Sequence, residues 1–283
     1  MSKLSVVLAV RNEEANIGRC LESVRQLADE IIVVDEYSTD KTREIAEGLG
    51  AKVYQEPHHD IFHITKQKAL DLAKYEWILQ LDADEVVTPE LAEEIKLVIR
   101  GQRLEIRNTK KYKLFQKHQE LIERRDGVVG RPTGEIVGYF IPRRNIFLGQ
   151  PLIHAGVYPD GVIRLVKKGK ARFLQKSVHD QIILDGKVGW LQNDLEHNDS
   201  PTLKRYFNRM NRYTDLQAEE LKVKKTPKTV WSFLRFTILH PTYYFLLLFF
   251  RHLGFLDGVR GFLWSFFSAM HFPVAYFKYL TRG

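Results

Sequence analysis

Two aspartates, Asp82 and Asp84, stand one residue apart directly after the apolar run 77–81. Hard divalent cations such as Mg²⁺ and Mn²⁺ prefer carboxylate oxygens, and they commonly take one or two of them together with phosphate oxygens of a substrate. A cation held in this way neutralises the charge that builds up on a departing diphosphate. Surface loops produce an Asp-x-Asp triplet by chance, so its place at the end of a buried strand is what favours a metal site.

The elements that position this pair follow from the hydrophobic pattern of the first hundred residues. Short apolar runs alternate with amphipathic stretches, which predicts an α/β fold with a mostly parallel sheet and right-handed crossovers. The expected strands are 4–10, 31–35, 51–55 and 77–81, and the expected helices are 13–26, 41–48, 64–74 and 89–100. Ligands of such sheets bind beyond the carboxyl ends of the strands. Asp35, which ends the second strand, should therefore lie on the same rim as Asp82.

Three motifs in this order resemble the family 2 glycosyltransferases, which have the GT-A fold. The run 6–14 (VVLAVRNEE) is similar to that family's first strand and the turn after it, 33–40 (VVDEYSTD) to its second strand, and 79–85 (LQLDADE) to its metal-binding motif. The resemblance implies a GT-A, Rossmann-like sheet flanked by helices. It also implies transfer of a sugar from a nucleotide-sugar donor, with a UDP-sugar favoured, and Mg²⁺ or Mn²⁺ as cofactor.

The same resemblance assigns donor-side roles by position. It places Asn12 and Glu13 beside the nucleotide, Asp35 on the base, Lys66 facing the donor, Asp82 at the ribose or the metal, and Asp84 on the metal. Two positions depart from the family pattern. Gln67 stands where asparagine is commoner, and Glu36-Tyr37 replaces the small residues that often follow the second-strand aspartate.

A narrower resemblance begins past residue 140. The runs 141–149 (IPRRNIFLG), 154–160 (HAGVYPD) and 164–166 (RLV) are similar to the lipopolysaccharide-core glucosyltransferase branch, which implies a lipid-linked or lipopolysaccharide-core glycan acceptor. An inverting transfer needs a base that takes the proton of the acceptor hydroxyl. Asp180 is the first choice, because the family usually shows a His-Glu pair at this place, and Asp160 is the reserve.

Further basic and imidazole side chains are candidates for binding phosphate or the acceptor. Guanidinium groups match phosphate oxygens bidentately, although a solvated surface position explains some of these residues equally well. The candidates are Arg143, Arg144, His154, Arg164 and His179. His197 falls in a helix-like pattern, which favours a packing or acceptor-side role.

The C-terminal region differs in kind from the rest of the chain. Two uncharged stretches rich in aromatic residues, 236–250 and 261–277, each contain a proline and are shorter than the roughly 20 apolar residues that a spanning helix needs. Their flanking Arg and Lys residues favour an interfacial or re-entrant pair that contacts the membrane surface through 229–280. A buried hairpin that packs on the domain or on a second subunit is the alternative.

These patterns divide the chain into a glycosyltransferase domain and a helical tail. The expected parts are a domain over 1–225, with a nucleotide-binding half (1–100), a charged insertion (101–138) and an acceptor half (139–225), and then a membrane-associating tail over 226–283. The single cysteine, Cys20, fits a reducing compartment, and no secretory signal precedes the first strand. We therefore expect a peripheral or monotopic protein on the cytoplasmic face of the inner membrane.

Other classes of protein fit the chain less well. The net charge of +8 calls for an anionic partner, but the chain shows no helix-turn-helix, zinc or RNA-binding signature, so nucleic acid is not expected. A nucleotidyltransferase should show a glycine-rich loop where residues 11–14 (RNEE) stand. The remaining alternatives are a polyprenyl-phosphate glycosyltransferase, a catalytically inactive relative and, more distantly, a non-catalytic basic protein that binds nucleic acid or membrane.

Overall fold

The computed structural model describes residues 3–102, 109–173 and 182–282, which fall into two compact units. Unit 1 comprises residues 1–143 and 159–197, and unit 2 comprises residues 144–158 and 198–283. Two long strands, β6 (Ile136–Phe147) and β12 (Leu195–Ser200), begin in unit 1 and end in unit 2.

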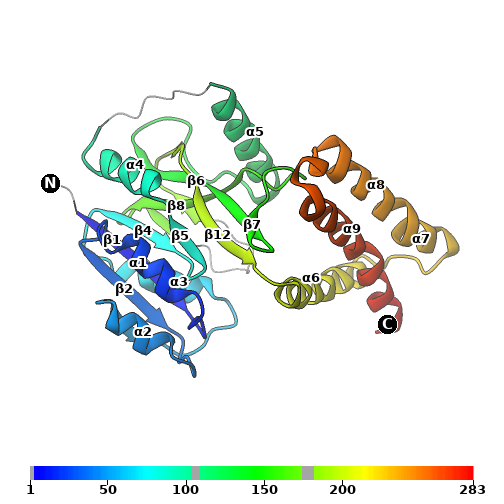
Figure 1. Cartoon of the computed structure of the whole chain (residues 1–283), viewed down its shortest axis with the longest axis horizontal. Coiled ribbons are helices and arrows are strands. Elements are labelled where there is room, and N and C mark those ends of the chain that lie inside the picture. Colours follow the sequence, from blue (N-terminus) through cyan, green and yellow to red (C-terminus); the bar gives the residue numbers. More distant parts are fainter. Residues whose placement is uncertain (1–2, 103–108, 174–181, 283) are drawn as a thin grey trace. The chain divides into compact units, whose positions relative to one another are not determined.

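The helices and strands of unit 1 alternate through its first hundred residues (Figure 1). Besides β6 and β12, they are β1 (Leu4–Val10), α1 (Ile17–Val24), β2 (Glu30–Asp35), α2 (Thr42–Gly48), β3 (Lys52–Gln55), α3 (His63–Leu72), β4 (Trp77–Leu81), β5 (Glu85–Val87), α4 (Pro89–Ile99), α5 (Thr109–Asp126), β8 (Asp160–Lys167), β9 (Ala171–Phe173), β10 (Ile182–Leu184) and β11 (Lys187–Trp190).

The strands form a mixed sheet in the order β3-β2-β1-β4-β8-β6-β12-β5. Pairing is parallel among β3, β2, β1 and β4, and antiparallel for β4–β8, β8–β6 and β12–β5. The expected α/β sheet flanked by helices is confirmed. The first helix starts later than expected, at Ile17, because residues 13–16 form a turn in which the Asn16 and Ile17 amides both donate to the Glu13 carbonyl.

Two hydrophobic cores cover the two faces of this sheet. Leu4, Val6 and Leu8 of β1 face a core that α1, α2 and α4 complete, whereas Val7 faces a second core with residues of α3 and α5. Side chains of a strand alternate between faces, so a strand that is buried on both sides reads as a continuous apolar run. That is the pattern of residues 4–10.

The charged insertion contains α5, an 18-residue helix. Phe115 and Ile122, seven residues apart, lie on one face of α5 and are buried in the second core. The ring of Trp190 stacks at 4.6 Å on both Phe115 and Phe140. The charged residues therefore form the solvent face of a docked helix, and the sheet resumes before the end of the expected insertion, at Ile136.

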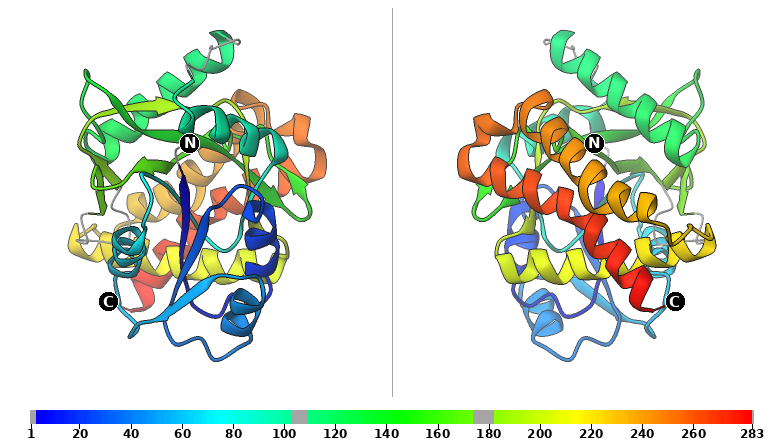
Figure 2. Two further views of the ribbon diagram at one scale, coloured as in Figure 1. Left: turned by 90° about the vertical axis from the view of Figure 1, so that its left-hand side faces the viewer. Right: turned by 90° about the vertical axis from the view of Figure 1, so that its right-hand side faces the viewer.

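Unit 2 is mainly helical. Its elements are β7 (Gln150–Pro151), α6 (Leu203–Val223), α7 (Val230–Leu234), η1 (Arg235–Leu239), α8 (His240–Leu246), η2 (Leu247–Arg251), η3 (Gly254–Asp257) and α9 (Gly258–Thr281). The segments α7 to η2 follow one another without a break and run beside α9 (Figure 2). Phe147, Tyr206 and Met210 form a core against α9, with Trp264 and Phe267 on its inner side.

The helical run Val230–Arg251 has 22 residues, and its most apolar 18-residue window has a mean hydropathy of 1.3 and is only 6% buried. By length and composition it could cross a membrane. The helix is thus longer than the uncharged stretch 236–250 from which an interfacial segment was expected. The helix does not stop at its charged or proline positions: it includes Arg235 and continues through Pro241, which follows the wide π-helical turn η1.

Candidate active site

The first loops of unit 1 are fastened to each other at the carboxyl ends of β1 and β2. The side-chain oxygen of Asn12 accepts a hydrogen bond from the Thr39 amide at 2.8 Å, and the Asn12 amide donates to the Ser38 hydroxyl at 2.8 Å. The amide of Glu13 donates to the Thr42 hydroxyl at 2.7 Å. The residues that the sequence placed beside a nucleotide thus shape one rim of the sheet.

Asp35 ends β2 on this rim and is fully buried. Its carboxylate accepts hydrogen bonds from the amide and the hydroxyl of Ser38, at 3.1 and 2.5 Å. Because Val10 pairs with Asp35, and Leu8 of the same strand pairs with Leu81, the ends of β2, β1 and β4 lie next to one another. The expected common rim for Asp35 and Asp82 is therefore present.

Asp82 follows β4 and carries a cation on each carboxylate oxygen. Lys66 Nζ lies 2.5 Å from Oδ1, and the Arg164 guanidinium is paired with Oδ2. Burial alone raises the pKa of Asp82, but Arg164 and then Lys66 outweigh it and hold that pKa well below its usual range. Asp82 is accordingly a permanent anion that fixes the Lys66 ammonium at the rim.

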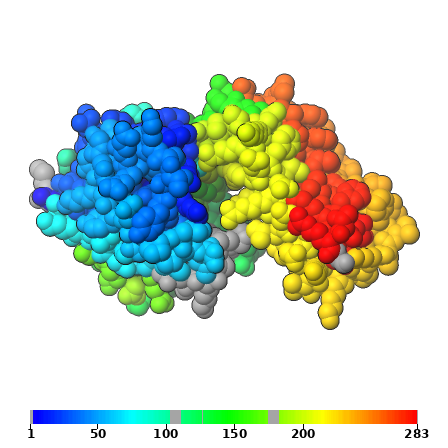
Figure 3. All heavy atoms as spheres, turned by 90° about the horizontal axis from the view of Figure 1, so that it is seen from below, coloured from blue at the N-terminus to red at the C-terminus, as the bar shows by residue number. Residues whose placement is uncertain are grey.

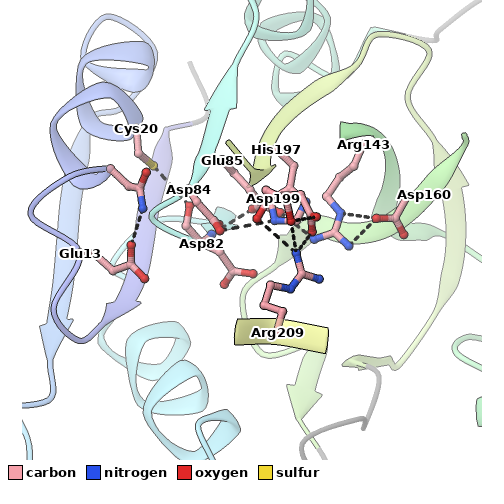
Figure 4. A network of polar contacts seen from close by, with 12 residues as sticks. Glu13, Cys20, Asp82, Asp84, Glu85, Arg143, Asp160, His197, Asp199 and Arg209 are labelled. Atoms are coloured by element: carbon pink, nitrogen blue, oxygen red, sulfur yellow. Dashed lines mark hydrogen bonds and ion pairs between the residues drawn. The ribbon is translucent and has the colours of Figure 1, made fainter. Parts of the chain in front are cut away.

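Two arginines complete a buried network around Glu85, which is fully buried (Figure 4). Arg164 donates to Glu85 Oε1 at 2.7 Å, and Arg143 Nη1 lies 3.3 Å from the same oxygen. Arg143 also donates to Asp160 Oδ2, through Nη2 at 2.6 Å and Nε at 3.0 Å. Arg143 and Arg164, which were candidates for binding phosphates, are thus paired with carboxylates. Asp160, the reserve candidate for the base, is the partner of Arg143.

Asp84 belongs to the same group of polar side chains and faces an imidazole (Figure 4). Nε2 of His197 is 3.5 Å from Asp84 Oδ2, and the side chains are 12% and 16% exposed. His197 stands on β12, directly opposite Glu85 of β5. The helix-like interpretation of His197 is therefore wrong. The strand was not expected because the polar run 195–200 (LEHNDS) lacks the apolar alternation that is typical of a strand.

The pair of Asp84 and His197 suits a divalent cation whose remaining ligands come from the phosphates of a nucleotide. It offers one oxygen and one nitrogen donor, and Mg²⁺ and Mn²⁺ sites of nucleotide-binding enzymes often combine one or two protein ligands with phosphates and water. Within residues 3–102, 109–173 and 182–282, no cluster of three or more His, Cys, Asp or Glu side chains is arranged to hold a metal. The residues therefore fit a site in which the protein and a nucleotide both supply ligands to the cation, rather than a site built from protein ligands alone.

The remaining sequence candidates lie elsewhere. Arg144 and His154 belong to unit 2, where His154 Nδ1 is 2.8 Å from Asp257 Oδ1 and its amide donates to Oδ2 at 2.8 Å. His154 thus anchors its loop to the start of α9. His179 and Asp180 lie outside the residues that the structure describes. Cys20 is fully buried in α1, as expected for a small core residue.

The sheet has a parallel half that ends in a rim of carboxylates and an antiparallel half that brings a histidine to that rim, which is the arrangement expected of a GT-A glycosyltransferase. The sequence model of Glycosyl transferase family 2 matches residues 5–150, and the chain belongs to this family. It is a glycosyltransferase.

Relatives of the chain carry matching names. An uncharacterized glycosyltransferase of Rickettsia bellii is 30% identical over 238 residues, which cover 81% of this chain and 71% of that one. The lipopolysaccharide core biosynthesis glycosyltransferase LpsC of Rhizobium meliloti is 28% identical over 280 residues, 94% of this chain and 90% of that one. A solved structure of TarS from S. aureus aligns with 91% of this chain and 46% of that one, at 18% identity and a TM-score of 0.42.

Proposed function

We propose that this glycosyltransferase uses Mg²⁺ or Mn²⁺ to transfer a sugar from a UDP-sugar to a lipid-linked or lipopolysaccharide-core glycan, with inversion, at the cytoplasmic face of the membrane. The observation that carries the proposal is the Asp84–His197 pair at the end of β4, beside the Lys66–Asp82 ion pair. Together these groups supply two metal ligands and an ammonium, which is what a diphosphate leaving group requires.

The donor would lie across the ends of β1, β2 and β4. The loop that carries Asn12 and Glu13 would contact the nucleoside, Asp35 would reach the base once Ser38 releases its carboxylate, and Asp82 would hold Lys66 toward the diphosphate. The metal, held by Asp84 and His197, would offset the charge of the departing diphosphate. Asp82 is close to the same position, but both of its oxygens already face cations, so we assign it to the donor side.

The transfer itself needs a base for the acceptor hydroxyl. Asp180 keeps this proposed role, because Asp160 is engaged by Arg143. A carboxylate that accepts the proton as the acceptor oxygen attacks the anomeric carbon, with the diphosphate leaving on the opposite side, gives inversion. The anomeric configuration of the product, read by NMR, would test this step.

The acceptor assignment is supported by two independent features. LpsC is named for lipopolysaccharide core biosynthesis and aligns over nearly the full chain. In unit 2 the apolar run Val230–Arg251 is left largely uncovered, which suits an enzyme whose acceptor is anchored in a membrane. A polyprenyl phosphate is the second acceptor class that this surface would suit.

The test is release of nucleotide from UDP-, GDP- and ADP-sugars with and without Mn²⁺, in wild type, Asp84→Ala and His197→Ala. We expect Mn²⁺-dependent release of UDP that falls at least about 100-fold in Asp84→Ala and about tenfold in His197→Ala. Asp185→Ala, which alters an exposed carboxylate of unit 1, is the matched control. Equal release with and without metal, or full activity in Asp84→Ala, would contradict the proposed site. Core oligosaccharide and polyprenyl phosphate, offered as alternative acceptors, separate the two acceptor classes.

A further inference from the structure

Unit 2 contains a cavity of about 350 Å³ that takes no part in the chemistry described above. Its walls are one face of α6 and one face of α9, and Tyr244 of α8 borders it. Figure 3 shows α6, in yellow, and the C-terminal part of α9, in red, meeting at the surface. Small-molecule sites are commonly of this size and lie between helices.

The helical repeat explains why these side chains gather. Along α6, Tyr206, Tyr213 and Gln217 recur at spacings of seven and four residues, which keeps them on one face. Along α9, Trp264 and Ser268 stand four residues apart on the facing side. Two amphipathic helices thus place aromatic rings and hydrogen-bonding groups around a common space.

The rings and the polar groups are held in place by contacts within the unit. Tyr206 and Trp264 meet edge to face at 5.8 Å, and the Tyr206 hydroxyl bonds to Ser268. The Arg209 guanidinium is paired with Asp199 and lies 5.9 Å from the Tyr213 ring centroid. Side chains that are fixed in this way form a site with little entropy left to lose when a ligand binds.

The charges in the cavity balance. Arg209 is matched by Asp199, and His271 is neutral at pH 7, because burial and then the nearby Arg209 lower its pKa. Burial raises the pKa of Tyr206 to about 12, so its hydroxyl stays protonated. Without an unmatched cation the cavity does not favour a phosphate, and its hydroxyl, amide and imidazole groups suit a ligand that carries hydroxyls better than a hydrocarbon chain.

We propose that this cavity binds a neutral sugar residue of the acceptor, stacked on the rings of Tyr213 and Trp264 and hydrogen-bonded by Gln217, Ser268 and the Asp199–Arg209 pair. A pyranose ring presents apolar C–H faces and a rim of hydroxyls, which is the mixture that the cavity offers. That the sugar belongs to the acceptor rests on the proposed function. The position beside Tyr244, within the helical run Val230–Arg251, suits the head of a membrane-anchored glycan.

The test is saturation-transfer NMR of the full-length protein with methyl glucoside and maltose, without donor or metal. We expect saturable binding with a Kd on the order of 1 mM for such small ligands. Tyr213→Ala and Gln217→Ala should each weaken it by about tenfold, the effect of a lost ring contact or hydrogen bond. Phe207→Ala is the matched control, because Phe207 is an α6 ring of similar exposure (43% against 41% for Tyr213) that does not line the cavity.

Each result decides for or against the site. Sugar binding that is lost in Tyr213→Ala and Gln217→Ala but kept within about twofold in Phe207→Ala supports it. The proposal is overturned if the wild type gives no saturable signal or if all variants bind the sugar equally. It is also overturned if laurate displaces the bound methyl glucoside and maltose does not, because that result would indicate a pocket for a lipid chain. Donor hydrolysis by the same wild-type preparation reports on the proposed function separately, so either proposal can fail alone.

Discussion

Replacing Arg164 with leucine would remove the central cation of the buried network. The Arg164 side chain is 7% exposed and pairs with Asp82 and with the fully buried Glu85. Removing one partner of a buried ion pair typically costs about 3–5 kcal/mol, because the other partner stays buried and uncompensated. Lys66 remains on Asp82, and Arg143 remains 3.3 Å from Glu85, so we expect a loss near the lower end, about 3 kcal/mol.

The loss should depend on pH in a defined direction. The folded-state pKa of Asp82 is lowered, so its ionisation contributes stability above the unfolded-state pKa of about 3.9, and this contribution disappears as the pH falls through the folded-state value. Arg164→Leu removes the largest single contribution to that lowering. The stability gap between wild type and variant should therefore be full at neutral pH and should narrow below about pH 4.

Urea unfolding followed by tryptophan fluorescence, at about pH 7 and about pH 3.5, measures this gap. With a slope of about 2 kcal/mol per molar urea, the midpoint should fall by about 1.5 M at neutral pH. Arg131→Leu is the control, because Arg131 and its partner Asp185 are both more than half exposed, and such pairs contribute at most about 1 kcal/mol. A loss in Arg164→Leu no larger than in the control, or a gap that is unchanged at low pH, would refute the electrostatic account.

Two further predictions concern unit 2. Gly261→Ala should lower its stability by about 1–3 kcal/mol in thermal unfolding, because a Cβ at this position would lie 1.8 Å from the Gly254 carbonyl oxygen. Gly48→Ala, whose added Cβ meets no atom within 4 Å, should change stability by less than about 1 kcal/mol, and equal losses in both variants would contradict the packing argument. The double variant Trp231→Glu/Tyr243→Glu should reduce co-sedimentation with anionic phospholipid vesicles at least about tenfold. Trp231 is 65% exposed and Tyr243 is 61% exposed, and both belong to the apolar run Val230–Arg251. Leu121→Glu, an equally exposed apolar position on α5, should bind vesicles as wild type does, and unchanged binding of the double variant would argue against membrane contact through this run.

The parallel half of the fold could be predicted from the sequence because three of its four strands, β1, β2 and β4, are compact apolar runs. The strands expected at 4–10 and 77–81 have those bounds in the structure, and Asp35 and Asp82 lie on the common rim. A strand that is buried on both faces can be recognised from its apolar composition alone. Residues placed directly after such strands are positioned by the sheet, whatever the later chain does.

The antiparallel half was harder to predict because its pairing depends on distant segments. His197 lies in a polar strand that forms because β6 and β5 are available on its two sides, and no local sequence pattern records those partners. The network of Arg143 and Arg164 with Glu85 likewise joins residues from three separate parts of the chain. The length of the helix Val230–Arg251 was underestimated because only its uncharged part, 236–250, was counted, although the helix begins before Arg235.

The pairing of β12 with β5 also makes the candidate metal site a late product of folding. Asp84 and His197 are more than a hundred residues apart in sequence, and they meet only once β12 has joined the sheet. Closing so long a loop is slow and entropically costly, so the contact should form after the parallel half has assembled. A nascent chain that ends near residue 150 already contains the carboxylate of the pair but lacks the imidazole. The completed pair would therefore distinguish a fully folded unit 1 from a partly folded one.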